Sequence, residues 1–539
     1  MSKFRGNPWA VLIVVSSGFF MTLLDLTIVN IAIPNMIDKL HAGLDEILWV
    51  INGYALVLAV LLITSGRLGD LRGPRNVFVA GITIFTLASA ACGLSANAGQ
   101  LIAFRVLQGL GAALLMPQTM TILTTVFPPE RRGAAFGVWG AVAGVATIAG
   151  PTLGGLLVTA FDWRWIFFVN LPIGVCVLAA TFILIPDMRP GRRHRLDLAG
   201  VLLAGASLFA ICFGLVEGQR YNWAKITSFL SIPLILAAGV VLLAAFLLVE
   251  KLRQGREPLV PFAVFRDRNF SLMNFVTGTL AIGMLGIFLP FTIYLQSVLG
   301  MSALKAGLTL APASFISMLL APVAGRLADR IGGKYILFTG LSLFAIGMGW
   351  AAATAQPGSR WYDFLPGLIV AGTGMGCIFA PLGTVAMRDV QPQLAGAASG
   401  LFNTNRQVGA VIGSAAVGAL LQNRLVASLT SQAAERGKAL PPAARAGFAR
   451  GFKEAAKSGL QVGAGQTGGS VNVRGVPPQT AQRLLHDIFT HGFVAAMHPT
   501  MAMPIAVIGV AALSCLGVKR HKGAAPEPSP ESAEVTTTA

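Results

Sequence analysis

Charged side chains are scarce in this chain of 539 residues. Only 12% of the residues are Asp, Glu, Lys or Arg, 55% are hydrophobic, and the mean hydropathy is +0.71. An ordinary soluble domain carries about 25% charged residues, so the composition excludes that class. Apolar runs of roughly 20 residues, the length that crosses a bilayer as a helix, recur along the chain. We therefore predict an all-α polytopic membrane protein embedded in a lipid bilayer.

Cysteine and histidine are also rare, with five and six residues. All five cysteines fall inside apolar runs, which excludes a disulfide framework. The sequence has no cluster of His, Cys and acidic residues that would serve a metal site or a membrane-embedded enzyme. The pattern G-x-x-x-x-G-K-[ST] is absent, so transport driven by ATP is excluded. We predict no enzymatic activity, no metal and no cofactor.

The apolar runs predict fourteen membrane spans. Lys3 and Arg5 precede the first run, which has no small-residue cleavage site, so we interpret it as a retained helix rather than a signal peptide. The predicted spans are 9–33, 47–66, 77–95, 100–124, 134–158, 165–185, 198–216, 229–249, 270–294, 304–324, 335–354, 364–386, 395–421 and 493–517.

The net charge of +18 follows the membrane topology rather than indicating a nucleic-acid partner. Lys and Arg concentrate in alternate short loops, and loops of this kind stay on the cytoplasmic side. With the N-terminus inside, both termini are cytoplasmic, and the protein is expected in the cell membrane as a monomer. The short external loops hold only Lys39, Arg164, Arg220, Lys225, Lys305 and Arg360.

One charged segment occurs twice. Residues 66–75 read GRLGDLRGPR and residues 325–334 read GRLADRIGGK, so the second copy begins 259 residues after the first (325 − 66). Each copy follows an apolar run, and each is either a hinge between moving bundles or a well-anchored loop; the duplication favours the hinge. The candidate gating residues are Gly66, Asp70, Gly73, Arg75, Asp329, Gly332 and Lys334.

The repeat divides the chain into two related halves. A second pair of similar segments, 133–137 (GAAFG) and 396–400 (GAASG), opens the fifth and thirteenth spans. Parallel halves of this kind are typical of transporters that rock around a site at mid-membrane. The predicted organisation is a six-helix half at 1–185, inserted helices at 186–268, helices 9–13 at 269–421, an external loop at 422–492, helix 14 at 493–517 and a disordered tail at 518–539. The external loop is either a flexible spacer or a lid.

Asp25 is the one acidic residue well inside a predicted span. An ionised Asp at that depth costs roughly 2.5–3.5 kcal/mol, so it is expected to face a cavity or a partner. Two roles are open to it: a structural hydrogen-bonded group, or a site that binds and releases protons.

Other polar residues within spans are candidates for the cavity. Arg105 lies close enough to a helix end to reach the outer surface. Arg406 lies deeper, so it either pairs with a carboxylate or binds substrate. The cavity candidates are Asn30, Gln108, Asn403, Arg406 and Gln407.

The fifth span carries a cluster of helix-bending and small residues, Gly150, Pro151, Gly154 and Gly155. Proline removes a helix hydrogen bond and glycine allows a neighbouring helix to approach closely. The thirteenth span lacks this proline, having Ser414 there. The predicted bend is therefore specific to one half.

These motifs together resemble the major facilitator superfamily. The 66–75 segment is similar to that family's signature between the second and third spans, G-x-x-x-D-R-x-G-R-R. Gly150 and Pro151 resemble its antiporter signature, and 105–109 (RVLQG) its arginine motif in the fourth span. The resemblance implies the major facilitator fold, with two six-helix halves plus two inserted helices.

Three further segments, 25–34, 163–165 (WRW) and 170–172 (NLP), together with the fourteen spans, resemble the drug:proton antiporters of the QacA and EmrB type. This resemblance implies proton-driven export of lipophilic compounds such as drugs, antibiotics or secondary metabolites. It further implies that Asp70 and Arg75 help to gate, and that Asp25 and Arg105 serve proton coupling. The alternatives are a proton-coupled importer, a metabolite exporter of narrow specificity, and a receptor that does not transport.

Overall fold

A computed structural model describes residues 7–40, 44–128, 131–187, 197–218, 221, 223–227, 229–253, 259–391, 394–436 and 478–519. Within these ranges the regular structure is helical, apart from one isolated bridge between Lys225 and Ser231. The N-terminal helices are α1 (Pro8–Leu40), α2 (Leu44–Arg72), α3 (Pro74–Gly93), α4 (Ala98–Val126), α5 (Arg132–Ala160), α6 (Trp165–Phe168) and α7 (Asn170–Leu184). The helices that follow are α8 (Leu198–Glu217), α9 (Ile232–Leu252), α10 (Arg268–Ile293), α11 (Ala303–Ile331), α12 (Lys334–Ala353), α13 (Leu365–Gly376), α14 (Phe379–Met387), α15 (Ala395–Arg436) and α17 (Pro478–Cys515).

Thirteen of the fourteen predicted spans correspond in order to helical segments that could cross a membrane. Thirteen helical segments in the described residues are long and apolar enough to cross a membrane. The predicted span that is not among them, 134–158, falls in α5, a helix of 29 residues. Two spans consist of consecutive helices, α6 with α7 and α13 with α14. The all-α polytopic fold is therefore confirmed.

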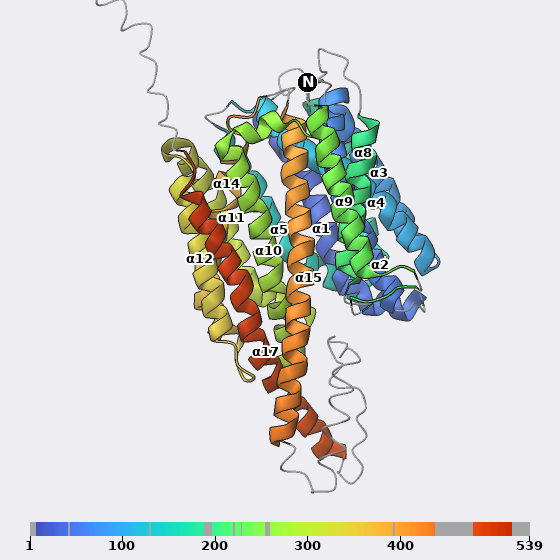
Figure 1. Cartoon of the computed structure of the whole chain (residues 1–539), viewed down its shortest axis with the longest axis vertical. Coiled ribbons are helices and arrows are strands. Elements are labelled where there is room, and N and C mark those ends of the chain that lie inside the picture. Colours follow the sequence, from blue (N-terminus) through green and yellow to red (C-terminus); the bar gives the residue numbers. More distant parts are fainter. Residues whose placement is uncertain are drawn as a thin grey trace, which may run out of the picture.

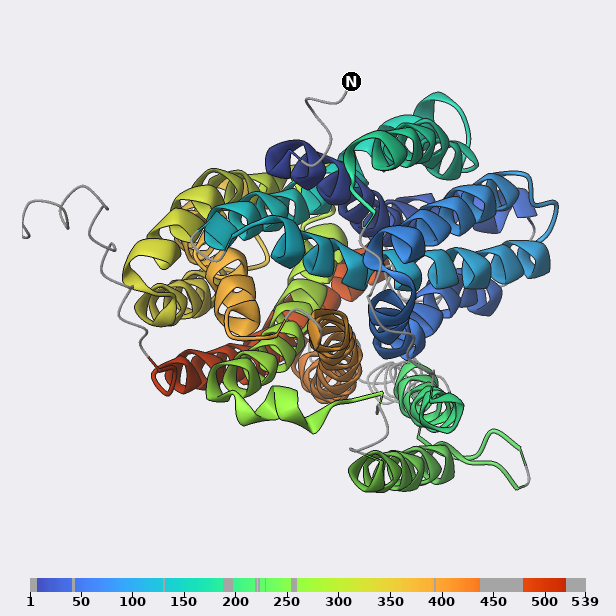
Figure 2. The ribbon, with the colours of Figure 1, turned by 90° about the horizontal axis from the view of Figure 1, so that it is seen from above.

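The helices form two bundles with a separate pair beside them. Helices α1–α7 make the N-terminal half and α10–α17 the C-terminal half, side by side in Figures 1 and 2. The halves meet along two seams, one between α5 and α11 and the other between α2 and α15. The inserted pair α8–α9 lies outside both bundles, and α8 packs against both α2 and α15. The insert thus covers one seam and leaves the other bare.

The repeated charged segments are not the loops that the sequence predicted. Helix α2 continues to Arg72 and α3 begins at Pro74, so one residue separates them. That residue, Gly73, has φ 88°, and its counterpart Gly332 has φ 86°, in the left-handed region that favours glycine. The apolar pattern ends before the helix does, because the last turns project beyond the lipid and carry charged residues.

The predicted external loop at 422–492 is likewise shorter than expected. Helix α15 runs on to Arg436 and α17 starts at Pro478, so residues 422–436 and 478–492 are helical. These two extensions, which we call the stalk, pack together through side chains such as Leu429, beside Gly492, and Arg436 pairs with Asp487 at 3.5 Å. Figure 1 shows the stalk projecting from the bundle. The remainder, 437–477, and the tail from 520 lie outside the described residues.

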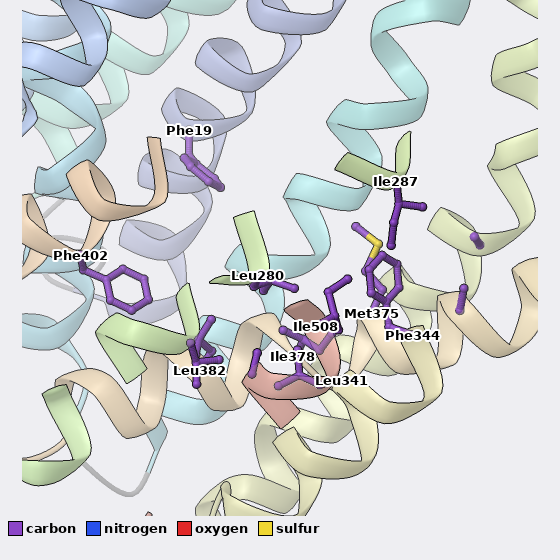
Figure 3. Packing of buried hydrophobic residues seen from close by; sticks show 14 of the residues in the cluster. Phe19, Leu280, Ile287, Leu341, Phe344, Met375, Ile378, Leu382, Phe402 and Ile508 are labelled. Atoms are coloured by element: carbon purple, nitrogen blue, oxygen red, sulfur yellow. The ribbon is translucent and has the colours of Figure 1, made fainter. Parts of the chain in front are cut away.

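The interior of the C-terminal half is apolar. Ile287, Leu341, Phe344 and Met375 are at most 6% exposed and pack together in Figure 3. Met375 and Ile378 flank the break between α13 and α14, which the packed side chains enclose. This half is therefore densely packed, and the N-terminal half either moves relative to it or stays fixed against it.

Candidate functional site

Asp70 fastens the N-terminal half to the start of a helix in the other half. Its two carboxylate oxygens accept hydrogen bonds from the backbone N–H groups of Gly396 and Ala397, each at 2.8 Å. These residues are the first turn of α15, where unpaired N–H groups and the helix dipole favour a negative charge. Arg67, one turn earlier on α2, lies 4.0 Å from the same carboxylate. We call this arrangement the first latch.

Asp329 makes the same arrangement in the opposite direction. It accepts hydrogen bonds from the N–H groups of Gly133 at 2.9 Å and Ala134 at 3.2 Å, in the first turn of α5. A carboxylate of the C-terminal half thus caps a helix of the N-terminal half, and this is the second latch. Both latches lie at one end of the bundle, which we call the latch end. The second sequence repeat, 133–137 and 396–400, is now explained, because these segments receive the two carboxylates.

Glycines allow the latches to close. A Cβ atom on Gly66 would lie 2.3 Å from the carbonyl oxygen of Gly396, and one on Gly325 would lie 2.0 Å from that of Gly133. Farther along the second seam, a Cβ on Gly137 would lie 2.8 Å from the carbonyl oxygen of Ala321. No real Cβ atom tolerates such distances, so the helices of the two halves approach to backbone contact.

The last basic residue of each charged segment behaves differently in the two copies. Arg75 donates a hydrogen bond to the carbonyl oxygen of Phe182 at 3.1 Å and lies 5.7 Å from that ring. It therefore caps the end of α7 within its own half. Lys334 faces a small cavity instead. The predicted gating residues Gly66, Asp70, Gly73, Asp329 and Gly332 thus lie at the joints between helices, whereas Arg75 and Lys334 lie beside them.

Asp25 is buried in the N-terminal half and is paired. Its carboxylate forms an ion pair with Arg105, and the two side chains are 0% and 1% exposed. Gln108 donates to the same carboxylate at 2.9 Å and accepts from Arg105 at 2.8 Å. Arg105 does not reach the outer surface, so that sequence-based option is wrong. Gln108, predicted as a cavity residue, belongs to this polar cluster.

Residues from three other helices complete the cluster. Asn170 on α7 lies 3.4 Å from the Asp25 carboxylate and donates to Ser89 on α3 at 3.1 Å. Arg105 donates to the carbonyl oxygen of Val50 at 3.0 Å, and its guanidinium lies 4.3 Å from the centre of the Tyr54 ring. Every charged or polar partner therefore comes from within one half. Buried charges need such partners, since removing one leaves the other uncompensated.

Apolar side chains surround this cluster. Leu101, Trp163 and Phe167 are fully buried in a group that also contains Leu24 and Ile28 from either side of Asp25. The Arg105 guanidinium lies 5.7 Å from the centre of the Phe167 ring. The ion pair is thus separated from solvent by apolar side chains in this structure.

Arg406 reaches from α15 toward the N-terminal half. Its guanidinium nitrogen lies 3.3 Å from the sulfur of Met116, and its centre is 6.0 Å from the Phe19 ring. Phe19 in turn stacks on Trp139 with ring centres 4.2 Å apart. Among the described residues no carboxylate lies within 4.0 Å of Arg406, so the prediction that it pairs with one is not met. The alternative, contact with substrate, stays a prediction.

Asn403 lies one turn before Gln407 on the same helix. It is 1% exposed and donates to the carbonyl oxygen of Ser399 at 2.9 Å, but its side-chain oxygen has no hydrogen-bond partner among the described residues. Trp139 Nε1 is also buried without one in that part of the chain. Gln407 is half-buried. The side chain of Asn30 lies outside the described residues.

The glycine-rich cluster in α5 packs on α1. A Cβ on Gly150 would lie 2.0 Å from the hydroxyl of Thr27, two residues beyond Asp25, whereas one on Gly155 would meet nothing within 4 Å. Gly154 is buried, and α5 is a single helix through Pro151. Of this predicted motif, Gly150 therefore has the close helix contact that was expected, and Gly155 does not.

Sequence reasoning missed Tyr54, Ser89 and the carbonyl of Val50 as partners of the ion pair. These residues lie in two predicted spans, 47–66 and 77–95, and carry no local pattern that distinguishes them from packing residues. Asn170 had one signal, its place in the segment 170–172. The general lesson is that a buried charge predicts the existence of partners but not which helices supply them.

Two related helical bundles, joined at mutual helix caps and enclosing a buried ion pair, define a membrane transporter built from parallel repeats. The chain belongs to the Major Facilitator Superfamily, whose family model matches residues 15–414. The fold agrees with that of the proton:xylose symporter XylE, with a TM-score of 0.57 at 12% identity over 97% of each chain.

Curated relatives are transporters and resistance proteins. An uncharacterized MFS-type transporter of Mycobacterium tuberculosis is 42% identical over 79% of this chain and 73% of its own length. A tetracenomycin C resistance and export protein of Streptomyces glaucescens is 36% identical over 79% and 78%. A puromycin resistance protein of Streptomyces alboniger is 36% identical over 76% and 80%. These relatives indicate a transporter rather than an enzyme.

Proposed function

We propose that this protein is a proton-driven exporter of lipophilic drugs, antibiotics or secondary metabolites, of the fourteen-span antiporter type. The observation that carries the proposal is the buried pair of Asp25 and Arg105 inside one half of a protein with two interlocking latches. Relatives named for tetracenomycin C export and puromycin resistance support the substrate class.

The latch end faces the cytoplasm in this proposal. Its two charged segments are rich in Arg and Lys, and basic residues near span ends favour the cytoplasmic side. Both termini then lie in the cytoplasm and the stalk projects outside the cell membrane. Single cysteines at Ser431 in the stalk and at Arg330 in the latch end, in a cysteine-free background, test this orientation. An impermeant thiol reagent on intact cells should label the first and spare the second; the reverse pattern would overturn the orientation.

Closed latches correspond to a state that is shut toward the cytoplasm. Opening that side requires Asp70 and Asp329 to leave the helix starts that they cap, and each such contact is worth about 0.3–1 kcal/mol, more when partly buried. Contacts of this size hold a state firmly while still allowing it to switch. The two latches therefore gate access from the cytoplasm.

Asp25 is the coupling group because protonation changes the charge balance of the cluster. An ionised Asp25 neutralises Arg105, and a guanidinium stays protonated, so the carboxylate is the member that titrates. Protonation leaves Arg105 as an uncompensated buried charge, at a cost of about 3–5 kcal/mol. A rearrangement that hydrates or re-pairs Arg105 relieves this cost, and in this way proton binding drives the change of state.

The substrate lies between the halves, near Arg406, Phe19 and Trp139. Stacked aromatic rings and Met116 accept a lipophilic body, while the guanidinium and the amide of Asn403 contact its polar groups. Aromatic rings offer large apolar surface with a fixed geometry.

The deciding measurement is proton movement coupled to substrate movement. Purified protein in proteoliposomes with a trapped pH indicator should release protons from the lumen when tetracenomycin C or puromycin is added outside and driven inward. Protein with Asp25→Asn should show no such proton signal. Proton and substrate moving in the same direction would support the importer instead. Absence of any proton signal with either compound, despite transport, would overturn the proton coupling.

A further inference from the structure

A cavity lies at the latch end of the C-terminal half, next to the turn that follows the second latch and away from Asp25. It is a narrow crevice, partly open to solvent, where the start of α10, the turn between α11 and α12, the end of α14 and the segment after α17 meet. Lys334, Arg388 and Lys519 line it from three of these elements. The described helices thus bring together three cations that are far apart in the sequence.

These cations form no ion pair within the part of the chain that the structure describes. Among the described residues no carboxylate lies within 4.0 Å of Lys334, Arg388 or Lys519. The nearby acid Asp267 accepts hydrogen bonds from the N–H groups that start α10, at 2.9 and 3.3 Å. Asp329, five residues before Lys334, is committed to the second latch. The remaining nearby acid, Asp389, follows Arg388 directly and is exposed. A concave site with three positive charges and no ion-paired carboxylate among the described residues attracts an anion.

The N-terminal half shows that the site is specific to one copy. The residue equivalent to Lys334 is Arg75, which fills the corresponding place by bonding to the carbonyl oxygen of Phe182 and stacking on its ring. In the C-terminal half the end of α17 does not provide such a contact. The backbone N–H of Lys519, just past α17, instead donates to the side chain of Asn269 at 3.0 Å, and the Lys334 ammonium lies 5.7 Å from the centre of the neighbouring Tyr335 ring. The same fold position is therefore closed by protein in one half and left for a ligand in the other.

Exposed apolar side chains close in sequence to the lining residues distinguish a lipid from a free ion. Ile331 and Tyr335, on either side of the α11–α12 turn, are 52% and 47% exposed. Leu513 and Leu516, at the end of α17, are 63% and 43% exposed. Exposed apolar side chains at a helix end in a membrane protein contact acyl chains, while basic groups at the same level meet head groups.

We propose that this cavity binds the phosphate group of an anionic membrane lipid from the leaflet at the latch end. The phosphodiester lies among Lys334, Arg388 and Lys519, and the acyl chains follow the apolar faces of α12 and α17. The lipid then ties the ends of α12, α14 and α17 together beside the turn that carries Gly332. The site is independent of the proposed export function, because none of its arguments involves the substrate or Asp25.

The test uses the purified full-length chain and lipid retention measured by native mass spectrometry. The probes are phosphatidylglycerol, phosphatidylcholine and inorganic phosphate, each added to the protein in mild detergent. The variant is the double substitution Arg388→Gln with Lys519→Gln. The matched control is Lys251→Gln with Arg266→Gln, which removes two exposed basic residues elsewhere near span ends. Gel filtration and circular dichroism establish that each protein is folded.

Wild type and control should retain phosphatidylglycerol in preference to phosphatidylcholine, and the Arg388 and Lys519 variant should bind it about tenfold more weakly. Equal retention by the variant and the control would overturn the site. Inorganic phosphate that displaces phosphatidylglycerol completely at equal concentration would overturn the lipid assignment, because the apolar contacts would then contribute nothing.

Discussion

The two halves of this transporter make equivalent contacts at the latch end, but they differ in their buried charged side chains. Each half supplies one carboxylate to the other and receives one in return, through Asp70 and Asp329. Each has a glycine with a positive φ directly after the charged helix end. The buried ion pair, in contrast, belongs to the N-terminal half alone. Among the described residues the buried charged side chains are Asp25, Arg67, Arg105, Glu217 and Glu250, and none lies in α10–α17.

This difference indicates that the two halves have different roles in the proposed mechanism. In the proposed mechanism a gate between two bodies needs equivalent contacts on both, and both copies of the repeat supply them. The proposed proton site needs a titratable group only once, and the interior of the other half is the apolar packing seen in Figure 3. The halves are symmetric where they touch at the latch end and asymmetric inside.

The largest effect is expected from removing the charge that only one half carries. Asp25→Asn should abolish accumulation of substrate against a gradient, because a proton crossing 100 mV supplies about 2.3 kcal/mol, enough for a gradient of about 50-fold. Substrate binding should remain, since Asn keeps the shape of the side chain. Efflux assays in energised vesicles measure this, with Asp162→Asn, at a surface ion pair with Arg164, as the control. Uphill transport by Asp25→Asn at the normal rate would make Asp25 structural.

The second largest effect is expected from neutralising the two latch carboxylates. Asp70→Asn and Asp329→Asn should each slow transport by about fivefold, and the double variant more than either, because each loses a charged cap worth about 1 kcal/mol. Surface expression should be unchanged. Transport rates of the three variants give the answer. A normal transport rate in the double variant would show that both segments only set the membrane topology.

Glycine substitutions should test the two seams with a smaller effect. Gly137→Ala places a methyl group 2.8 Å from the carbonyl oxygen of Ala321, and Gly400→Ala places one 2.9 Å from that of Leu62. Both should destabilise the closed latch end by about 1–3 kcal/mol, as overpacked sites do. Gly155→Ala, whose methyl group would meet nothing, is the control. Thermal unfolding and thiol labelling at the latch end measure the effect, and equal behaviour of all three would show that the seams are not tightly packed.

The smallest effect is expected in the stalk. Arg436→Gln removes an exposed ion pair with Asp487, and such pairs contribute about 0–1 kcal/mol. Transport should stay within about twofold of wild type. A severe loss would assign the stalk a direct part in transport, whereas Leu429→Asp, which disrupts its packing, should be the more damaging of the two.

The fold was predictable because the bilayer imposes a simple rule on the sequence. Runs of roughly 20 apolar residues marked each span, and the duplicated 66–75 and 325–334 segments marked the halves. The same rule did not identify helical segments that extend beyond the lipid. The helical end of α2 and the stalk are bathed in water, so they carry charged residues and fall below any apolar threshold.

The residues of the candidate site were likewise predictable only in part. Asp25 and Arg406 stood out because charge is costly in a membrane, and the structure pairs only the first of them. Leu425, Leu429 and Ala433 recur every four residues, and this spacing could have predicted the packed stalk. The partners of Arg105, in contrast, lie 51 and 55 positions away at Tyr54 and Val50, and no local pattern connects them.

Helix α15 is long enough that a small tilt about the first latch moves the stalk over a large distance. This helix has 42 residues, which at 1.5 Å each makes a rod of about 63 Å, roughly twice the thickness of the hydrocarbon layer. Asp70 holds one tip, and the stalk is the other. A tilt of about 10° around the latch sweeps the far tip by about 11 Å for a rod of that length. In the orientation and gating that we propose, a binder that grips the stalk from outside restrains a gate on the opposite side of the membrane without entering the cell.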